Sequence, residues 1–513
     1  MFVRGGMSKR LHSLQQHLKN ENPILAEVVN SFSALDKVSR RLGFFTAEES
    51  HATRMPWWPL ISILGIYSAG KSAFINYYLG HNLQATGNQA VDDKFTVICF
   101  TNEPEVRVLP GLALDADPRF PLYNISQAIE EVAEGDGDHV DAYLQLKTCP
   151  SEKLRGRILI DSPGFDADAQ RTSTLRITDH IIDLSDLILV FFDARHPEAG
   201  SMPDTLKHLV NSAINRRDSN KFLYILNQID NTAREDNPEE VFAAWQRALA
   251  QHGLTAGCCY AVFNPEVALP IQDTNVRTRL ESKRDVDMKA IKDRIEQVGV
   301  ERAYRIVGML EHTARKIEQK IVPRLQRFID DWRRMVLWTD GVVFGGLLLV
   351  FLVVTIWAGF WNGLQFNLPL WQYMKQYPVL KNGTLLLLAG VALYVHLSIR
   401  RRMADRVGTK LLKQVKDPDE HANYRLAFQK NSNWQRSIFF RQPLGWTKRA
   451  QAVLVEVLED TNAYIQKLND RYTNPSGRIA SNVDNDAAGA GSMAADKRSG
   501  KPEDKPFKVI GQE

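Results

Sequence analysis

The segment 65–72 constrains this chain more than any other, because it reads Gly-Ile-Tyr-Ser-Ala-Gly-Lys-Ser and fits the pattern G-x-x-x-x-G-K-[ST]. The apolar run Leu60–Leu64 precedes it, and a helical pattern over Ala73–Leu79 follows it before Gly80. A strand, a glycine loop and a helix N-terminus in this order direct backbone N–H groups and a positive dipole end at a polyphosphate. We therefore predict a nucleoside triphosphate site here.

Each residue type in this loop has an expected role. Lys71 would reach the β- and γ-phosphates, and the Ser72 hydroxyl would ligate Mg²⁺. The alternative, a glycine-bearing turn with a chance lysine, is disfavoured by the coincidence of the strand, both glycines, the lysine and the serine. The other expected phosphate-binding residues are Gly65, Ser68, Ala69, Gly70 and Ala73.

Residues 57–270 alternate short apolar runs with helical patterns, which predicts a mainly parallel sheet covered by helices. The fold class is therefore α/β, of the P-loop NTPase type, with helical segments on both sides. Strands are expected at Thr96–Phe100, Tyr143–Leu146, Ile158–Ile160, Leu187–Phe192, Phe222–Leu226 and Tyr260–Phe263.

Two further motifs directly follow predicted strands, where open α/β sheets bind their ligands. The first, Asp-Ser-Pro-Gly at residues 161–164, offers the Asp161 carboxylate to Mg²⁺ through water and the Gly164 N–H to the γ-phosphate. Each of the two motifs is a common loop sequence when it stands alone. Their order behind strands, after the P-loop, indicates a nucleotide-triphosphate switch domain.

The second motif, Asn-Gln-Ile-Asp at residues 227–230, approximates the N-K-x-D motif with which GTPases bind the base. The aspartate, here Asp230, accepts hydrogen bonds from guanine N1–H and N2–H. Gln228 replaces the lysine whose stem normally packs over the base, which puts guanine selectivity in doubt. Asn227 and Asp230 favour GTP, and ATP stays the alternative.

The P-loop together with Phe-Ile-Asn at 74–76 resembles the dynamin superfamily, especially its EH-domain-containing ATPase branch, whose members prefer adenine. Residues 109–114 and 117–121 resemble the insert of that branch, so the resemblance spans roughly residues 55–265. It implies a dynamin-type G domain with nucleoside triphosphatase activity, dependent on Mg²⁺ and GTP or ATP. It also implies a homodimer through the G domains, or a higher oligomer.

The family's switch threonine is absent, because Val91-Asp92-Asp93 stand in its place and Thr96 is the nearest hydroxyl. The resemblance therefore implies hydrolysis that is slow or that depends on another group. Tyr67, where dynamins proper have glutamine, agrees with the EH-type branch. The candidate catalytic residues are Lys71, Ser68, Thr96 and Gly164.

Helical patterns flank the nucleotide domain. Asn22 and Pro23 should begin an amphipathic helix that Gly43 ends, and its apolar face needs a later helix as partner. Residues 284–335 carry apolar side chains in steps of three and four, typical of helix bundles and coiled coils, and Pro323 should kink this helix. The predicted order is N-terminal stalk helices 1–50, G domain 55–275, stalk helix 284–335, transmembrane helix 338–361, external loop 362–380, transmembrane helix 381–399, C-terminal stalk helices 403–472 and disordered tail 473–513.

Two uncharged apolar stretches, Val342–Phe360 and Gly383–Ile399, approach the ~20 residues that cross a ~30 Å hydrocarbon core. Lysines and arginines gather before the first stretch and after the second, so the positive-inside rule places both termini in the cytoplasm. Buried helices of a soluble protein are the alternative. The lack of an apolar N-terminal signal, and four cysteines without disulfide or zinc spacing, suit a bacterial inner membrane, with an organelle membrane as the alternative.

Two hypotheses about function follow. In the first, triphosphate-driven dimerisation through Asp92–Phe95 and Gly164–Asp168 swings the helical stalk, which transmits force to the lipid bilayer for tethering, fusion, fission or curvature. In the second, the chain is a membrane-anchored switch that recruits cytoplasmic partners and exerts no force. The formal net charge of +4 is too small to indicate nucleic-acid binding.

Overall fold

A mainly parallel eight-stranded sheet, in the order β3-β4-β2-β5-β1-β6-β7-β8, forms the centre of the nucleotide domain. The computed structural model describes residues 4–87, 94–115, 120, 125–126, 140–164, 172–196, 219–234, 238–251, 258–363, 365–366, 377–415 and 418–473. Among the strand pairs of this sheet, β2–β5 and β3–β4 are antiparallel. Its strands are β1 (Leu60–Gly65), β2 (Phe95–Phe100), β3 (Arg107–Pro110), β4 (Leu144–Cys149), β5 (Ile158–Asp161), β6 (Leu187–Asp193), β7 (Phe222–Asn227) and β8 (Cys258–Val262).

The predicted α/β fold class and all six strands predicted after the P-loop are present, with ends shifted by up to three residues. β3 was not predicted. Its four residues are all exposed and it ends at a proline, so it lacks the apolar run that marks the inner strands. Among the described strands it pairs with β4 alone, at the edge of the sheet.

The two faces of the sheet bury alternate residues of each strand. On one face Ile61, Leu189 and Ile225 pack against α3 (Lys71–Leu79) and the first part of α10 (Thr274–Lys316). The other face packs against α7 (Thr172–Leu184) and α9 (Pro238–Gln251). Short helices in this domain are α4 (Leu112–Asp115), α6 (Val140–Tyr143), η3 (Glu152–Leu154), η5 (Ser219–Lys221) and η6 (Ile229–Arg234), and η1 (Ala52–Arg54) precedes β1.

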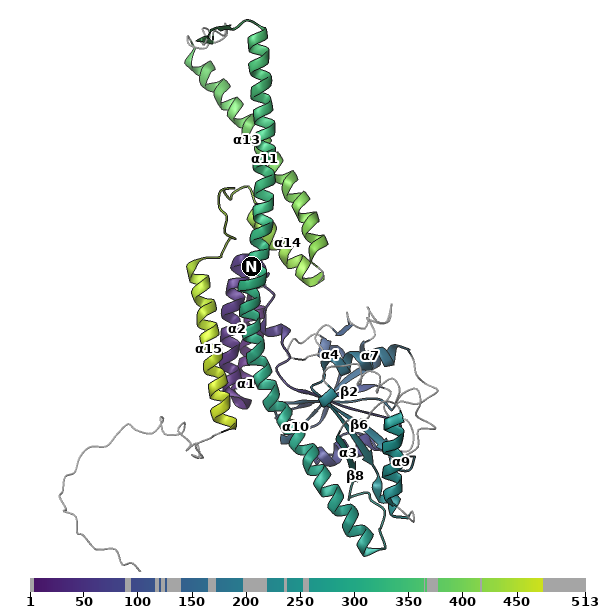
Figure 1. Ribbon diagram of the computed structural model, residues 1–513. Helices are drawn as coiled ribbons and strands as arrows, with labels where there is room; N and C mark the ends of the chain where they lie inside the picture. Colours follow the sequence, from purple (N-terminus) through teal and green to yellow (C-terminus); the bar gives the residue numbers. More distant parts are fainter. Residues whose placement is uncertain are drawn as a thin grey trace, which may run out of the picture. The chain divides into compact units, whose positions relative to one another are not determined.

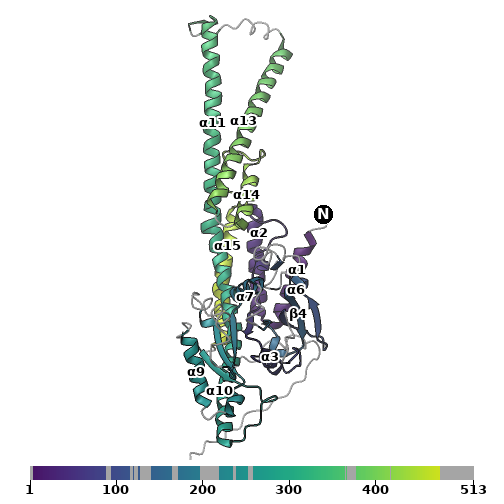
Figure 2. The ribbon, with the colours of Figure 1, turned by 90° about the vertical axis from the view of Figure 1, so that its right-hand side faces the viewer.

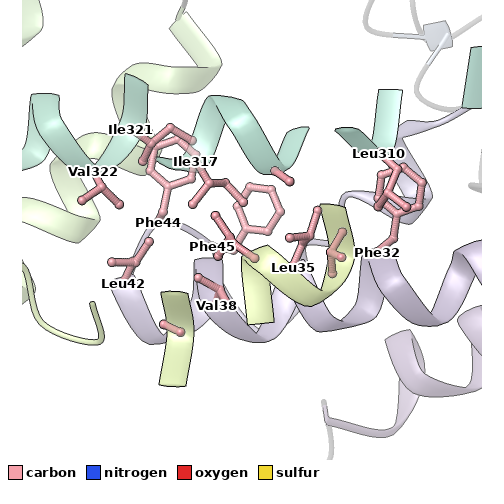
Figure 3. Packing of buried hydrophobic residues seen from close by; sticks show 14 of the residues in the cluster. Phe32, Leu35, Val38, Leu42, Phe44, Phe45, Leu310, Ile317, Ile321 and Val322 are labelled. Atoms are coloured by element: carbon pink, nitrogen blue, oxygen red, sulfur yellow. The ribbon is translucent and has the colours of Figure 1, made fainter. Parts of the chain in front are cut away.

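Two helices, α1 (Arg4–Glu21) and α2 (Pro23–Leu42), precede the nucleotide domain. As predicted, Asn22 is the extended N-cap of α2, Pro23 lies in its first turn, and Gly43 ends it at φ 79°. Helix does not continue to residue 50, because the chain leaves α2 at Gly43 and the next two residues, Phe44 and Phe45, are buried. Figure 3 shows α2 residues such as Phe32 and Leu35 beside Leu310 and the Ile317–Val322 segment, which is the later helical partner that α2 required.

A single helical run, Thr274–Trp357, joins α10, the π-helical segment η7 (Ile317–Ile321) and α11 (Val322–Trp357) (Figure 1). It begins at Thr274, ten residues before the predicted start at 284. The Asp273 carboxylate caps this start by accepting from the N–H groups of Asn275 and Val276. The disruption expected at Pro323 takes the form of the π segment. In an α-helix a proline ring clashes with the carbonyl of the residue four positions earlier. For Pro323 that residue is Gln319, which lies in the wider π-helical turn.

The end of α11 and the helix α13 (Pro378–Gln414) are each long and apolar enough to cross a membrane. The two helices contact each other near Trp332 and Arg400, and they diverge from there toward their apolar ends (Figures 1 and 2). Only 6% of the apolar window in each is buried, and side chains such as Leu386 and Trp357 are 74% and 90% exposed. A core helix of a soluble protein would hide such residues. Between the two helices, β9 (Trp361–Asn362) pairs with β10 (Gln365–Phe366).

Two further helices, α14 (Pro418–Ser432) and α15 (Lys448–Tyr472), complete the described chain. α15 packs on α2, where Ser31 Oγ donates to Asp460 Oδ2 at 3.1 Å and lies 3.0 Å from the Tyr464 hydroxyl. The chain divides into a larger unit, Met1–Leu468, and a smaller one, Asn469–Glu513, described as far as residue 473. The predicted disordered tail thus lies almost wholly outside the described residues.

Candidate nucleotide-binding site

The P-loop connects the C-terminal end of β1 to the first residue of α3, as the sequence predicts for a phosphate-binding turn. Its backbone needs left-handed conformations at Ser68, with φ 58°, and at Gly70, with φ 80°. Lys71 Nζ folds back onto the loop and donates to the carbonyls of Gly65 at 3.0 Å and Ile66 at 3.1 Å. The ammonium group is therefore held at the point where a phosphate would replace these carbonyls as its partner.

Lys71 is buried, and this burial lowers the pKa of its amine, while the nearby Asp161 carboxylate acts in the opposite direction. Asp161 ends β5 beside Ile63 of β1, so the parallel register brings it to the P-loop. Its Oδ2 accepts from Gln84 Nε2 at 2.7 Å, and Gln84 Oε1 accepts from Lys147 Nζ at 2.5 Å. This buried network orients the carboxylate, and no motif in the sequence marks Gln84 or Lys147.

The Asp-Ser-Pro-Gly loop lies directly against the P-loop. A Cβ atom added at Gly164 would lie 3.0 Å from Tyr67 Cα and 3.0 Å from Tyr67 Cδ2, so only glycine fits without displacement. Gly164 is thus brought to the phosphate-binding turn with Asp161. The next residues of the predicted dimer contact, 165–168, lie outside the described part of the chain, as do Val91, Asp92 and Asp93.

The loop after β7 clamps the P-loop. Asn227 Nδ2 donates to the Ala69 carbonyl at 2.9 Å, and Gln228 Nε2 donates to the Ser68 carbonyl at 2.7 Å. Gln228 has a positive φ of 65°, which turns the backbone so that both amides point at the same loop. The sequence shows Gln228 only as a missing lysine, so its contact with the P-loop was not foreseen.

Asp230 lies in η6, directly after β7. It is buried, and its Oδ2 accepts from the Leu269 N–H at 3.0 Å. Arg195 lies two residues after the end of β6, and its hydrogen bonds to Asp193 raise the pKa of its guanidinium, with a smaller contribution in the same direction from the Asp230 charge. These contacts fix the loops at the edge where a base would bind. The sequence did not identify Arg195 or Asp193.

The structure corrects the assignment of Thr96 as a catalytic residue. Thr96 lies inside β2, where it is fully buried, and its hydroxyl accepts from Gln145 Nε2 at 2.7 Å. It pairs across the antiparallel ladder with Asp161, so it supports that strand end from within the sheet. A buried strand side chain with its hydroxyl engaged does not position a water molecule above the P-loop.

The geometry therefore unites the three sequence motifs at one edge of the sheet. Residues 61–229, which contain the P-loop, Asp161, Gly164 and Asn227, match the model of the dynamin family. This part of the chain is a dynamin-family domain. Its mainly parallel sheet agrees with the fold that the resemblance implied.

The dynamin-family domain is similar to EH domain-containing protein 1 from several organisms. The protein of Arabidopsis thaliana is 27% identical over 179 residues, which are 34% of this chain and 30% of that protein. The protein of Homo sapiens is 26% identical over 182 residues, which are 34% of this chain and 31% of that protein. The match thus spans less than a third of the length of either relative.

Among solved structures, two from an oligomerised bacterial dynamin pair, described as sensing and tethering membranes over long range, are similar to this chain. One has 13% sequence identity and a TM-score of 0.30 and covers 92% of this chain and 73% of its own. The other has 13% identity and a TM-score of 0.29, covering 91% and 76%. The dynamin-family assignment rests on the domain match and not on these superpositions.

The hydrogen bonds from the Asn227 and Gln228 amides to the P-loop predict that removing one of these amides weakens triphosphate binding. Asn227→Ala leaves the Ala69 carbonyl without its donor, so we expect about tenfold weaker triphosphate binding, the equivalent of about 1.4 kcal/mol. Titration of the purified chain with a fluorescent triphosphate measures this. Asn102→Ala, at an exposed site, is the matched control, and unchanged affinity of the Asn227→Ala protein would contradict the clamp.

Proposed function

We propose that this chain is a membrane-anchored dynamin-like GTPase that couples nucleotide binding, G-domain dimerisation and hydrolysis to membrane remodelling. The observation that carries the proposal is the helical run Thr274–Trp357, which is continuous from the nucleotide domain to an exposed apolar end. A continuous helix carries a displacement along its whole length, whereas a flexible linker would absorb it.

The run contacts three different environments in turn. Met288 and Ile291 pack in the core beside α3 and the sheet, and Leu310 and Ile317 pack in the bundle with α2. Beyond residue 341 its side chains are largely exposed and uncharged. Movement of the first segment with the nucleotide domain would therefore displace the apolar segment.

A buried ionic junction supports this linkage at the edge of the sheet opposite the P-loop. Asp186 accepts from Arg302 at 3.0 Å and from Arg305 at 2.7 Å, and its other oxygen accepts from the Leu60 N–H at 3.0 Å. Arg302 also donates to the Pro56 carbonyl. Since Leu60 begins β1 and β1 ends at the P-loop, one strand connects this junction to the phosphate site.

The residues of the site fit a magnesium-bound triphosphate. The Lys71 ammonium group, which donates to two carbonyls of the loop, supplies a cation for the phosphates. The oxygens of Ser72 and Asp161 are the ligands that Mg²⁺ prefers. When bound, the ion would neutralise charge on the β- and γ-phosphates. Ser68, Ala69 and Ala73 would complete the phosphate contacts with the backbone of the loop.

In the catalytic proposal, Lys71 transfers its hydrogen bonds from the loop carbonyls to the phosphates. The N–H of Gly164 and the hydroxyl of Ser68 donate to oxygens on which charge develops. We propose that Asp230 binds guanine and that Asn227 and Gln228 keep the P-loop in place. The bond from the Leu269 N–H to Asp230 occupies one carboxylate lone pair, and this observation keeps ATP as the second candidate.

The two apolar helices would anchor the chain. We propose an inner-membrane protein with both termini in the cytoplasm, because positive charges precede the first span and follow the second. The homodimer would form through Asp92–Phe95 and Gly164–Asp168, with the bilayer as second partner. The alternative is a membrane-anchored switch that recruits cytoplasmic proteins without acting on the bilayer.

Reconstitution into vesicles tests the remodelling proposal. We expect triphosphate to cluster or reshape vesicles that carry the wild-type chain and to leave those with Lys71→Ala unchanged, because the variant loses the phosphate contact of its ammonium group. Light scattering and electron microscopy are the measurements. Equal behaviour of both proteins would contradict remodelling, and triphosphate-dependent capture of a partner on unchanged vesicles would favour the switch. Parallel titrations with GTP and ATP decide the base.

A further inference from the structure

A loop far from the nucleotide site, residues 433–447 between α14 and α15, is held against the end of the second candidate span. Arg400 directly follows the predicted span 381–399, and it is only 7% exposed. Its Nη2 donates to the carbonyls of Asn433 at 3.0 Å and Arg436 at 2.7 Å. The guanidinium carbon also lies 5.2 Å from the ring centroid of Trp332, which fixes its position on α11. The loop therefore lies where the apolar part of α13 ends.

This loop is a folded element. Ile438 is 6% exposed and packs in the helical cluster that contains Trp332 and Ile399. Asn431 Oδ1 accepts from the Leu444 N–H at 2.8 Å and from the Arg436 guanidinium, so both sides of the loop are tied to α14. A loop constrained in this way presents the same side chains outward.

The outward side chains are large and apolar. Trp434 is 67% exposed, Phe439 is 73% exposed and Phe440 is 64% exposed. A soluble surface rarely gathers such residues without a partner. Exposed arginines occur in the same loop, directly after Phe440 at Arg441, and on α13, directly after Arg400 at Arg401 and Arg402.

We propose that the loop 433–447 is a third membrane contact, which inserts Trp434, Phe439 and Phe440 into the headgroup region beside the two spans. The inference rests on the proposed membrane anchor. Aromatic side chains partition to the boundary between headgroups and acyl chains, and neighbouring arginines bind anionic phosphates. The bonds from Arg400 place this chemistry at the end of a span, which favours lipid over a protein partner.

Site-specific photocrosslinking of the full-length chain in vesicles tests the proposal. The photoreactive side chain is introduced as Phe439→p-benzoylphenylalanine, an aromatic replacement at an exposed site that leaves Ile438 in place. Leu386→p-benzoylphenylalanine, in the second span, is the positive control. Val286→p-benzoylphenylalanine, at a site 65% exposed in the nucleotide domain, is the negative control. Mass spectrometry identifies the adducts formed with phosphatidylcholine alone and with added phosphatidylglycerol.

We expect lipid adducts at positions 439 and 386 and none at 286, with the yield at 439 rising when phosphatidylglycerol is present. Lipid adducts at 386 without any at 439 would overturn the loop proposal and leave the anchor intact. Adducts of position 439 with protein alone would also overturn it and would identify a protein interface. Absence of lipid adducts at 386 would instead refute the anchor itself.

Discussion

Gly70→Ala should weaken triphosphate binding about a hundredfold or more, the largest effect that we expect from any single methyl group in the chain. An alanine at φ 80° costs about 1–2 kcal/mol. Its Cβ would also lie 2.3 Å from Asn227 Nδ2, so the amide must move and give up its bond to the Ala69 carbonyl, at a further cost of about 1–3 kcal/mol. Isothermal titration with a triphosphate measures the loss.

Gly80→Ala is the matched control for backbone strain. Gly80 ends α3 at φ 71° and has no atom within 4 Å of an added Cβ, so the replacement carries a similar backbone penalty without a clash. We expect lower stability with nearly unchanged triphosphate affinity. Equal losses of affinity in the two variants would show that strain in α3, and not the contact with Asn227, controls binding.

Asp186→Ala should lower the free energy of unfolding of the nucleotide domain by about 3–5 kcal/mol, the cost of removing one partner from a buried ion pair. The Arg302 side chain is only 12% exposed, and its burial already lowers the pKa of the guanidinium. The change also removes the acceptor of the Leu60 N–H. Hydrogen exchange at the amides of β1 should accelerate about a hundredfold or more.

The exposed pair of Glu239 and Arg279 provides the comparison. Its side chains are 73% and 58% exposed, so Glu239→Ala should change stability by less than about 1 kcal/mol. If Asp186→Ala proved as mild as this control, the junction would not hold β1 to α10. The route from nucleotide site to spans would then need a different contact.

The parts of the fold that short stretches of sequence determine, such as apolar strands and helix ends, could be predicted. The inner strands are short apolar runs buried on both faces, and Asn22, Pro23 and Gly43 carry their own boundary signals. The turn between β1 and α3 was predictable because its geometry demands glycine, lysine and serine at fixed spacing, and phosphate binding by these residues stays a prediction. Two long helices with exposed apolar windows were predictable from apolar length alone, and the spans 338–361 and 381–399 stay predictions.

Contacts between distant segments were not predictable in the same way. The first turns of α10 are polar, so the helix start at Thr274 gave no apolar stripe to recognise. Gln228 departs from the expected lysine, and the hydrogen bond from its amide to the Ser68 carbonyl joins two segments that are far apart in the sequence. Thr96 follows the strand pattern as well as the pattern of a switch hydroxyl, and burial decides between them.

Because the helix Thr274–Trp357 continues through η7, the number of residues in η7 determines how α11 is rotated about the helix axis relative to α10. An α-helix turns by about 100° per residue, so inserting or deleting a single residue between Lys316 and Val322 would rotate everything beyond it by that angle. Such a change leaves the composition and nearly the length of the helix intact, yet it points the apolar hairpin in a new direction relative to the nucleotide domain. The length of η7 therefore sets the direction, about the helix axis, in which the apolar hairpin faces relative to the nucleotide domain.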